Sequence, residues 1–220
     1  MNTDSLKKTI KEILDTIPAD VLLVAAAKTR SQEEVEIAIA AGVTHFGYNY
    51  LQEALPIIQS IGARAEWHFI GHLQRNKAKV VAQNFDMVET VDSLRLAQTL
   101  DRHCANLGKK MPILIEINSG RESNKTGILP EDVDDFILQI NTLEHLHIEG
   151  LMTMGPRFGE PEDSRPYFKA TREAFEGLAA KNIPNVEMRY LSMGMSNSYK
   201  IAIEEGANIV RIGTKLFGER

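Results

Sequence analysis

The sequence predicts an α/β fold in which residues 1–220 form one domain, a single (β/α)8 barrel of the TIM type. Short apolar segments alternate with amphipathic segments of helical period about eight times, at intervals of roughly 25 residues. The most apolar run, residues 21–27, lacks period-two alternation, which is typical of a parallel strand covered on both faces. A barrel needs about 200 residues or more, so the chain is long enough. An open doubly wound sheet is the structural alternative, because the sequence does not show closure.

Local signals locate the elements of the first half of the chain. Five apolar residues recur at helical spacing within residues 4–17, which predicts a helix before the first strand. Ser31 and Gly42 are expected to cap the two ends of the next helix. Pro56 is expected to interrupt or open the helix that follows the second strand. The expected strands here are 21–27, 43–47, 66–72 and 85–91, and the expected helices are 4–17, 31–42, 49–59, 75–82 and 93–107.

The second half repeats the alternation. Residues 112–118 are the clearest strand after the first, and a polar loop, residues 120–127, follows it. Pro130 suits the first turn of the next helix. A loop rich in glycine and proline, residues 155–161, follows the sixth strand. The expected strands here are 112–118, 145–154, one within 187–196 that ends in a glycine-containing turn, and an eighth within 207–218 that ends in a short helical turn. The expected helices are 130–140, 163–180 and 197–205.

Composition excludes several classes of protein. Hydrophobic content of 43% and charged content of 25% are ordinary globular values. The net charge of −5 gives no generally basic surface, so nucleic acid is not an expected partner. Cys104 is the only cysteine, which excludes an intrachain disulfide, and none of the six histidines belongs to an HExxH pair, so no metal site is expected. Residues 1–20 lack an apolar signal segment, so we expect a cytoplasmic protein without a membrane partner.

Lys28 follows the first strand at its carboxyl end, where α/β folds carry their chemistry. Burial against a core lowers the pKa of a lysine, and the resulting neutral amine is a nucleophile for carbonyl groups. The alternative is a lysine that opens the loop and points into water, and for a single strand-end lysine the pattern alone favours this alternative. The rest of the chain has to decide between the two.

Two later segments have the composition of a phosphate site. SMGMS, residues 192–196, supplies two hydroxyl groups, a glycine and the start of a helix, and IVRIGT, residues 209–214, ends the last strand. Barrel enzymes commonly bind phosphate at the loops after strands seven and eight. Together with a nucleophilic lysine, such a site suggests a ligand that carries both a carbonyl group and a phosphate. Pyridoxal 5′-phosphate (PLP) and a phosphorylated sugar both meet this description, and composition does not choose between them.

A set of motifs spread over nearly the whole chain is more specific. The motifs are AAAKTR, FGYNYLQEA, EWHFIGHLQRNK, VDSLRLA, GLMTM, LSMGMS and VRIGTKLFGER. In this order they resemble those of the pyridoxal phosphate homeostasis protein family. The resemblance implies a barrel like the N-terminal domain of alanine racemase, with PLP held as a Schiff base on Lys28.

The resemblance also implies roles for other residues. Arg211 is similar to the arginine that faces the pyridine nitrogen, and Asn49 to a residue beside the ring. The residues implied or expected to hold the phosphate are Ser196, Gly213 and Thr214, with a backbone N–H from Met193. The chain departs from the family pattern at Tyr48, where FGENY is usual, and this puts in doubt the ion pair that the glutamate makes. Lys125, in the polar loop, is expected to make no cofactor contact.

These implications favour a PLP carrier over an enzyme. An arginine at the pyridine nitrogen opposes its protonation, which weakens the ring as an electron sink. Racemases also take a second acid/base from an additional domain, which we do not expect in a chain that stops just after the eighth strand. We therefore expect a monomer that makes transient contacts with PLP-dependent apoenzymes. The alternatives are a fold-type III racemase or decarboxylase and a Schiff-base aldolase. Against the aldolase, Glu66 and Glu116 are expected at the edge of the core and His68 in a structural hydrogen bond.

Overall fold

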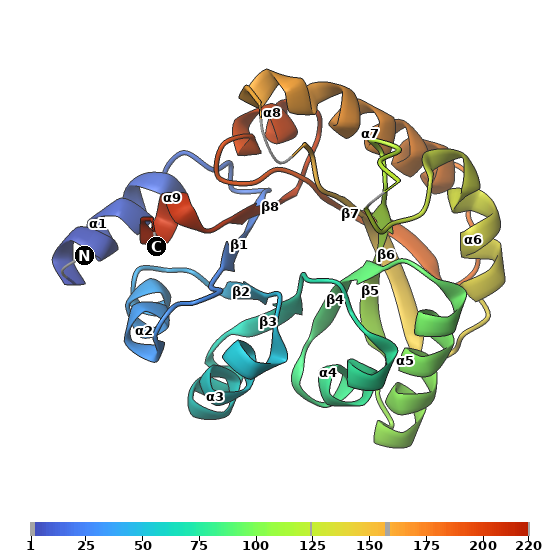
Figure 1. Cartoon of the computed structure of the whole chain (residues 1–220), viewed down its shortest axis with the longest axis horizontal. Coiled ribbons are helices and arrows are strands. Elements are labelled where there is room, and N and C mark those ends of the chain that lie inside the picture. Colours follow the sequence, from blue (N-terminus) through green and yellow to red (C-terminus); the bar gives the residue numbers. More distant parts are fainter. Residues whose placement is uncertain (1–2, 124, 157–158, 220) are drawn as a thin grey trace.

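The computed structural model describes residues 3–123, 125–156 and 159–219, and in it eight parallel strands close into a barrel in the order of the sequence (Figure 1). The predicted (β/α)8 barrel is therefore confirmed, and the open doubly wound alternative is wrong. The expected loops 120–127 and 155–161 contain residues 124 and 157–158, which lie outside the described ranges. The strands are β1 (Leu22–Ala26), β2 (His45–Tyr48), β3 (Glu66–Phe69), β4 (Met87–Val91), β5 (Met111–Ile117), β6 (Leu146–Thr153), β7 (Val186–Ser192) and β8 (Ile209–Ile212).

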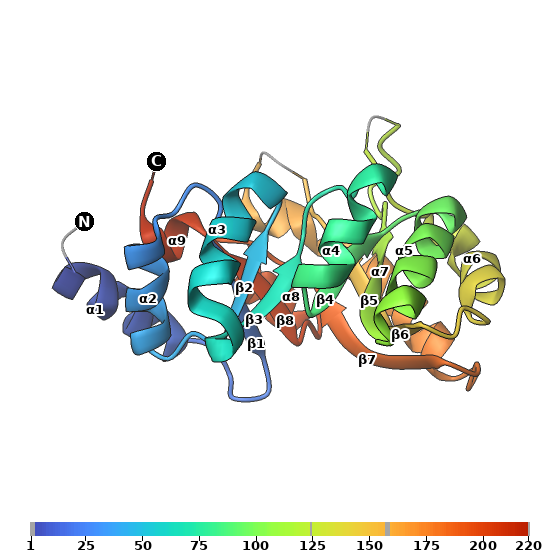
Figure 2. The ribbon, with the colours of Figure 1, turned by 90° about the horizontal axis from the view of Figure 1, so that it is seen from below.

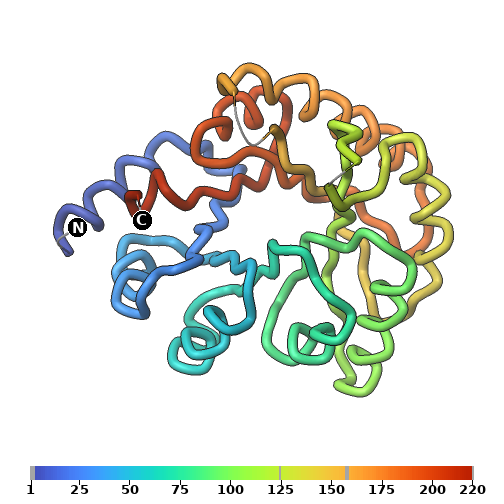
Figure 3. The backbone as a smooth tube through the Cα atoms, viewed as in Figure 1, coloured from blue at the N-terminus to red at the C-terminus, as the bar shows by residue number. Residues whose placement is uncertain are grey.

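Helices surround the strands in Figure 1, and α1 packs against α9 at the left of that view. The backbone trace shows that both ends of the chain lie on this side of the molecule (Figure 3). The α-helices are α1 (Thr3–Leu14), α2 (Gln32–Ala40), α3 (Leu51–Ile61), α4 (Ala78–Asn84), α5 (Leu94–Leu107), α6 (Val133–Ile140), α7 (Arg165–Ala179), α8 (Tyr199–Glu204) and α9 (Thr214–Phe217). Short 3-10 turns are η1 (Gly62–Arg64), η2 (Arg75–Lys77), η3 (Pro130–Asp132) and η4 (Pro161–Ser164).

Several expected boundaries differ from the structure by one to three residues, and one expected helix interruption is absent from the described α3. β3 ends at Phe69 instead of residue 72, because the chain bends at Gly71, where a Cβ atom would lie 2.5 Å from a backbone oxygen. β7 ends at Ser192, and Gly194 then turns the chain with a φ of +87°, in agreement with the expected glycine-containing turn. Pro56 does not interrupt α3: it lies inside the helix on the exposed side, where water can satisfy the carbonyl that loses its N–H partner.

The inside of the barrel has two layers, because side chains two residues apart on a strand point to the same face. The lower layer is apolar and buried; it contains Val24, Met87, Leu114, Met152 and Ile209, with Tyr190 packed against it. Two residues beyond Met87, Leu114, Tyr190 and Ile209, at the carboxyl end, the inward residue is polar: Glu89 on β4, Glu116 on β5, Ser192 on β7 and Arg211 on β8. All four are at most 5% exposed. The alternation therefore places a polar layer directly above an apolar one.

A buried hydrogen-bond network joins most of this polar layer. Glu89 Oε1 lies 2.7 Å from His68 Nδ1, and Glu89 Oε2 accepts a bond of 2.6 Å from the Ser192 hydroxyl. Arg211 donates to Ser192 Oγ at 2.5 Å and to the backbone oxygen of Thr153 at 2.8 Å, and its Nη1 lies 3.8 Å from Glu89 Oε2. Burial raises the pKa of Glu89, but His68, Arg211 and Ser192 outweigh burial and hold this pKa below its ordinary value. The guanidinium of Arg211 is thereby fixed in orientation.

Glu89→Gln is expected to lower the free energy of unfolding by about 3 kcal/mol at neutral pH, because it leaves the Arg211 charge buried without its counter-ion. A carboxyl with a lowered pKa stabilises the fold above its unfolded pKa, and this contribution is lost as the pH falls through the folded pKa. The difference between variant and wild type should therefore shrink below the ordinary value of 4.5. Urea unfolding at several pH values measures this.

The matched control is Glu176→Gln, which removes the carboxylate of the exposed Arg172–Glu176 pair on α7. An isolated surface pair contributes about 0–1 kcal/mol. Equal losses in the two variants would contradict the importance assigned to the buried network.

Gly150 marks the tightest contact between β6 and β7. A Cβ atom there would lie 1.8 Å from the backbone oxygen of Tyr190, and the φ of Gly150 is +146°. Gly150→Ala is therefore expected to cost about 3 kcal/mol of unfolding free energy. Gly177→Ala, in the exposed last turn of α7 with no neighbouring atom within 4 Å of the new Cβ, should instead raise stability by about 0.5 kcal/mol. Thermal unfolding should show a lower melting temperature for Gly150→Ala and a higher one for Gly177→Ala than for wild type.

Candidate functional site

A cavity of about 690 Å³ opens at the carboxyl ends of the strands. Ligand pockets are commonly about 300–1,000 Å³ in volume. Its 15 described lining residues come from every strand or following loop except those of β4. Six of the seven residues predicted to bind the cofactor are among them: Lys28, Asn49, Ser196, Arg211, Gly213 and Thr214. Figure 2 shows the segment after β5 on the upper side of the ribbon, opposite the loop that leads into β1.

Lys28 is held by a tight turn just after β1. The backbone N–H of Arg30 donates to the Ala27 oxygen at 3.1 Å, which closes the turn. Thr29 takes a left-handed conformation with a φ of +64°, and its backbone N–H donates to Glu53 Oε2 of α3 at 2.9 Å. Lys28 itself is half-buried and lines the cavity. The turn therefore presents this lysine to the pocket, in contrast to the alternative of a side chain that only points into water.

Arg211 supplies a fixed positive charge at the floor of the pocket. It lines the cavity while only 5% of its surface is exposed. Burial lowers its pKa, whereas the charges of Glu89 and Glu116 raise it. A guanidinium keeps its proton in proteins, so this residue is a permanent donor without acceptor capacity. Any polar atom of a ligand that approaches Arg211 has to accept a hydrogen bond.

The segments after β7 and β8 meet beside Lys28. Ser196 Oγ accepts the backbone N–H of Gly213 at 3.2 Å and that of Lys215 at 3.3 Å. A Cβ atom at position 213 would lie 3.1 Å from the Ala26 oxygen, so a glycine lets β8 leave the barrel close to β1. The two segments of the predicted phosphate site thus form one wall of the pocket, in which the Ser196 hydroxyl accepts two backbone N–H groups of the other segment.

Met193 does not join this wall. Its side chain is fully buried in the core, and its backbone N–H donates to the Ile209 oxygen at 3.0 Å. The expectation that this N–H turns toward a phosphate is therefore wrong, because the pairing of β7 with β8 already uses it. Met195, two residues further on, lies beyond the end of β7 and lines the cavity.

Sequence reasoning missed the polar residues on the opposite wall. Glu116, expected at the edge of the core, is 3% exposed and lines the cavity with Lys125 and Thr126. The loop after β5 folds back over the pocket because Asn118 Nδ2 donates to the backbone oxygens of Glu122 and Lys125. Lys125 thus lies on the cavity, and its expected lack of a cofactor contact stays a prediction. Glu116 lies two residues after Leu114 on the same strand, so both side chains point into the barrel, and this spacing was the signal in the sequence.

Tyr48, which stands where the family pattern usually has a glutamate, faces away from the pocket. Its ring is fully buried and packs against Trp67, with 6.3 Å between the ring centroids. Its hydroxyl has no hydrogen-bond partner among the described residues, and burial raises its pKa. Tyr48 thus belongs to the core between the barrel and its helices. His68, by contrast, makes the structural hydrogen bond that was expected, to Glu89.

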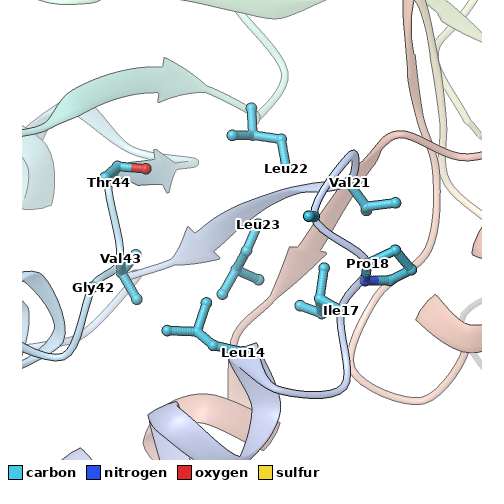
Figure 4. A pocket seen from close by; sticks show the side chains of 10 residues that line it. Leu14, Ile17, Pro18, Val21, Leu22, Leu23, Gly42, Val43 and Thr44 are labelled. Carbon is cyan, nitrogen blue, oxygen red and sulfur yellow. The ribbon is translucent and has the colours of Figure 1, made fainter.

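A second, smaller cavity of about 250 Å³ lies at the other end of β1, between α1 and the turn before β2 (Figure 4). Its ten lining residues are apolar except for Thr44, and none of them titrates. It offers no group that could act on a ligand. Elsewhere in the described ranges, no cluster of three or more His, Cys, Asp or Glu side chains could hold a metal ion. None of the described helices is long and apolar enough to cross a membrane.

Comparisons with known proteins agree with this geometry. The family model for the alanine racemase N-terminal domain matches residues 1–220. The pyridoxal phosphate homeostasis protein of Pasteurella multocida is 38% identical over 203 residues, which cover 91% of this chain and 87% of the relative. The protein of the same name from Escherichia coli K12 is 37% identical over 208 residues and covers 92% and 87%.

Solved structures of related proteins show the same fold. PipY of Synechococcus elongatus, determined with PLP bound, superposes with a TM-score of 0.88 at 31% identity and covers 97% of this chain and 100% of its own. Alanine racemase of Clostridium difficile superposes with a TM-score of 0.85 at 19% identity, so it shares the fold, and this chain covers 57% of it. The chain therefore belongs to the alanine racemase N-terminal domain family and, among its members, to the pyridoxal phosphate homeostasis proteins.

Proposed function

We propose that this chain binds PLP as a reversible Schiff base on Lys28 and acts as a carrier that keeps the cofactor in reserve without turning over amino acids. The observation that carries the proposal is the meeting of three chemically different groups in one cavity: the Lys28 amine, the Arg211 guanidinium and the wall formed by Ser196, Gly213 and Thr214. PLP offers an aldehyde, a pyridine nitrogen and a phosphate, one for each group. When bound, this cofactor supplies an electrophilic carbon and a conjugated ring.

Lys28 would provide the covalent attachment. Its neutral amine would attack the aldehyde carbon, and the carbon–nitrogen double bond would form with release of one water molecule. The turn fixed by Glu53 supports this role, because it holds the backbone on both sides of the lysine. Asn49 lies on the same cavity, and we assign it to the edge of the ring.

Arg211 would donate to the pyridine nitrogen. A permanent cation there keeps this nitrogen unprotonated, because a second positive charge beside it is unfavourable. The bond from Arg211 to Ser192 and the nearby charge of Glu89 support the role, since they fix the guanidinium before any ligand arrives. With an unprotonated ring the site is poor at stabilising carbanions, which favours storage of the cofactor over racemisation or decarboxylation.

The names of the relatives support the same choice, since the Pasteurella and Escherichia proteins are named for PLP homeostasis. We further propose a single-domain monomer in the cytoplasm that makes transient contacts with PLP-dependent apoenzymes. The thiol of Cys104 is free and buried, which suits a reducing compartment. The alternative is a fold-type III racemase or decarboxylase, and sustained turnover of amino acids by the purified PLP-loaded protein would contradict the carrier.

Lys28→Ala is expected to abolish the absorbance band of the Schiff base that wild type develops with added PLP, because the variant lacks the amine. Borohydride should reduce the wild-type carbon–nitrogen double bond, and peptide mass spectrometry should then find the adduct on Lys28. Lys79→Ala, which removes an exposed lysine from α4, is the matched control and should retain the band. A band that survives in Lys28→Ala would refute the attachment site.

Ser196→Ala should raise the dissociation constant for PLP about tenfold, because a hydrogen bond to a charged group is worth about 1.5–3 kcal/mol. Pyridoxal, which lacks the phosphate, separates the roles: wild type and variant should bind it equally well. Fluorescence titration with both compounds measures the difference. Equal weakening toward PLP and pyridoxal would show that Ser196 acts only by shaping the wall.

A further inference from the structure

Glu116 has an unsatisfied oxygen in the wall of the main cavity. The residue is 3% exposed and projects from β5 beside Arg211 and the loop after β5. Its Oε1 accepts one long hydrogen bond, 3.3 Å from the hydroxyl of Thr126, and its Oε2 has no hydrogen-bond partner among the described residues. A buried polar atom without a partner costs about 1–3 kcal/mol, and on the wall of a cavity a ligand that supplies a donor would remove this cost.

The charges around Glu116 make it able to hold a proton. Burial raises its pKa, and the carboxylate of Asp92 after β4 adds to this. The hydrogen bond from Thr126 and the positive charges of Arg211 and His72 act in the opposite direction. The other titratable groups on the cavity are those of Lys28 and Lys125. A carboxyl whose proton affinity exceeds that of a free glutamate, in a cavity with a nucleophilic lysine, is suited to exchange protons with an amine.

We propose that Glu116 is the binding group for a primary amine that enters the cavity to take the cofactor from Lys28. This inference rests on the proposed function, since it concerns how a stored cofactor leaves. A carboxylate with an open oxygen pairs with an ammonium group, which has three donors and no acceptor. A second anion would instead meet repulsion from Glu116. The ligand is therefore an amine, such as the side chain of a lysine or a free small amine.

The exchange balances in protons and bonds. The entering ammonium first gives one proton to the carboxylate of Glu116 and becomes a neutral amine. Its nitrogen then bonds to the carbon that carries the double bond to Lys28, the bond from this carbon to the Lys28 nitrogen breaks, and both protons of the entering amine move to the Lys28 nitrogen. Glu116 finally returns its proton to Lys28, which ends as an ammonium. The net change is one double bond exchanged between two amines, without oxidant or reductant.

Two probe amines test this step on the PLP-loaded protein. Butylamine is an ammonium at neutral pH and needs a proton acceptor before it can react, whereas hydroxylamine is already neutral. Glu116→Gln keeps the size of the side chain and an acceptor for Thr126, but it cannot titrate. The variant should lose the Schiff-base absorbance at least about tenfold more slowly than wild type with butylamine, and at an unchanged rate with hydroxylamine. Stopped-flow absorbance measures both rates.

Two further variants test whether the carboxyl group of Glu116, and not any carboxyl of the barrel, is required. Glu116→Asp retains a carboxyl and should recover part of the butylamine rate. Glu66→Gln removes an exposed carboxyl whose pKa is also raised by burial, but which lies at the other end of the barrel, at the start of β3. This control should exchange like wild type with both amines.

The outcomes are distinguishable. Equal butylamine rates in wild type and Glu116→Gln would overturn the role of Glu116 and leave the proposed carrier intact. Equal slowing with butylamine and hydroxylamine would also overturn it, because a change in the shape of the cavity affects both probes. Absence of a Schiff base in wild type would remove the proposed function and this inference together.

Discussion

A buried guanidinium is the constraint on which the rest of this structure depends. Arg211 projects inside the barrel, where an uncompensated charge would cost several kcal/mol. Glu89 compensates it from β4, and Ser192 and His68 satisfy the carboxylate of Glu89 in turn. The positions of these four residues are therefore coupled. A pocket floor built in this way is rigid before a ligand binds, which reduces the cost of ordering the site.

Barrel closure brings Lys28 and the wall that we propose to bind the phosphate together. β1 and β8 are neighbours, with Ala25 opposite Ile212, so residues from the two ends of the chain lie side by side. Lys28 follows β1, and Gly213 follows β8, where a Cβ atom would crowd β1. The carboxyl ends of the strands thus assemble a site from groups that have no proximity in the sequence, as barrels generally do.

Much of the fold and part of the site could be predicted from the sequence, because alternation and capping are local signals. The Ser31 cap of α2 was predictable in this way, and the structure contains the full capping box. Three-dimensional pairing decides the rest. Met193 has a hydroxyl-rich neighbourhood in the sequence, but its N–H belongs to the sheet. Glu89 and Glu116 are functional candidates only once closure turns them inward, and no local signal gives the partner that a buried carboxyl will find.

The apolar lower layer supports the cavity from below. Val24, Met87, Leu114, Met152 and Ile209 are each at most 6% exposed and pack together inside the barrel. The cavity opens at the carboxyl ends of the strands, on the side away from this layer. A protein that collects the content of the cavity through this opening must approach the face formed by the carboxyl ends of the strands.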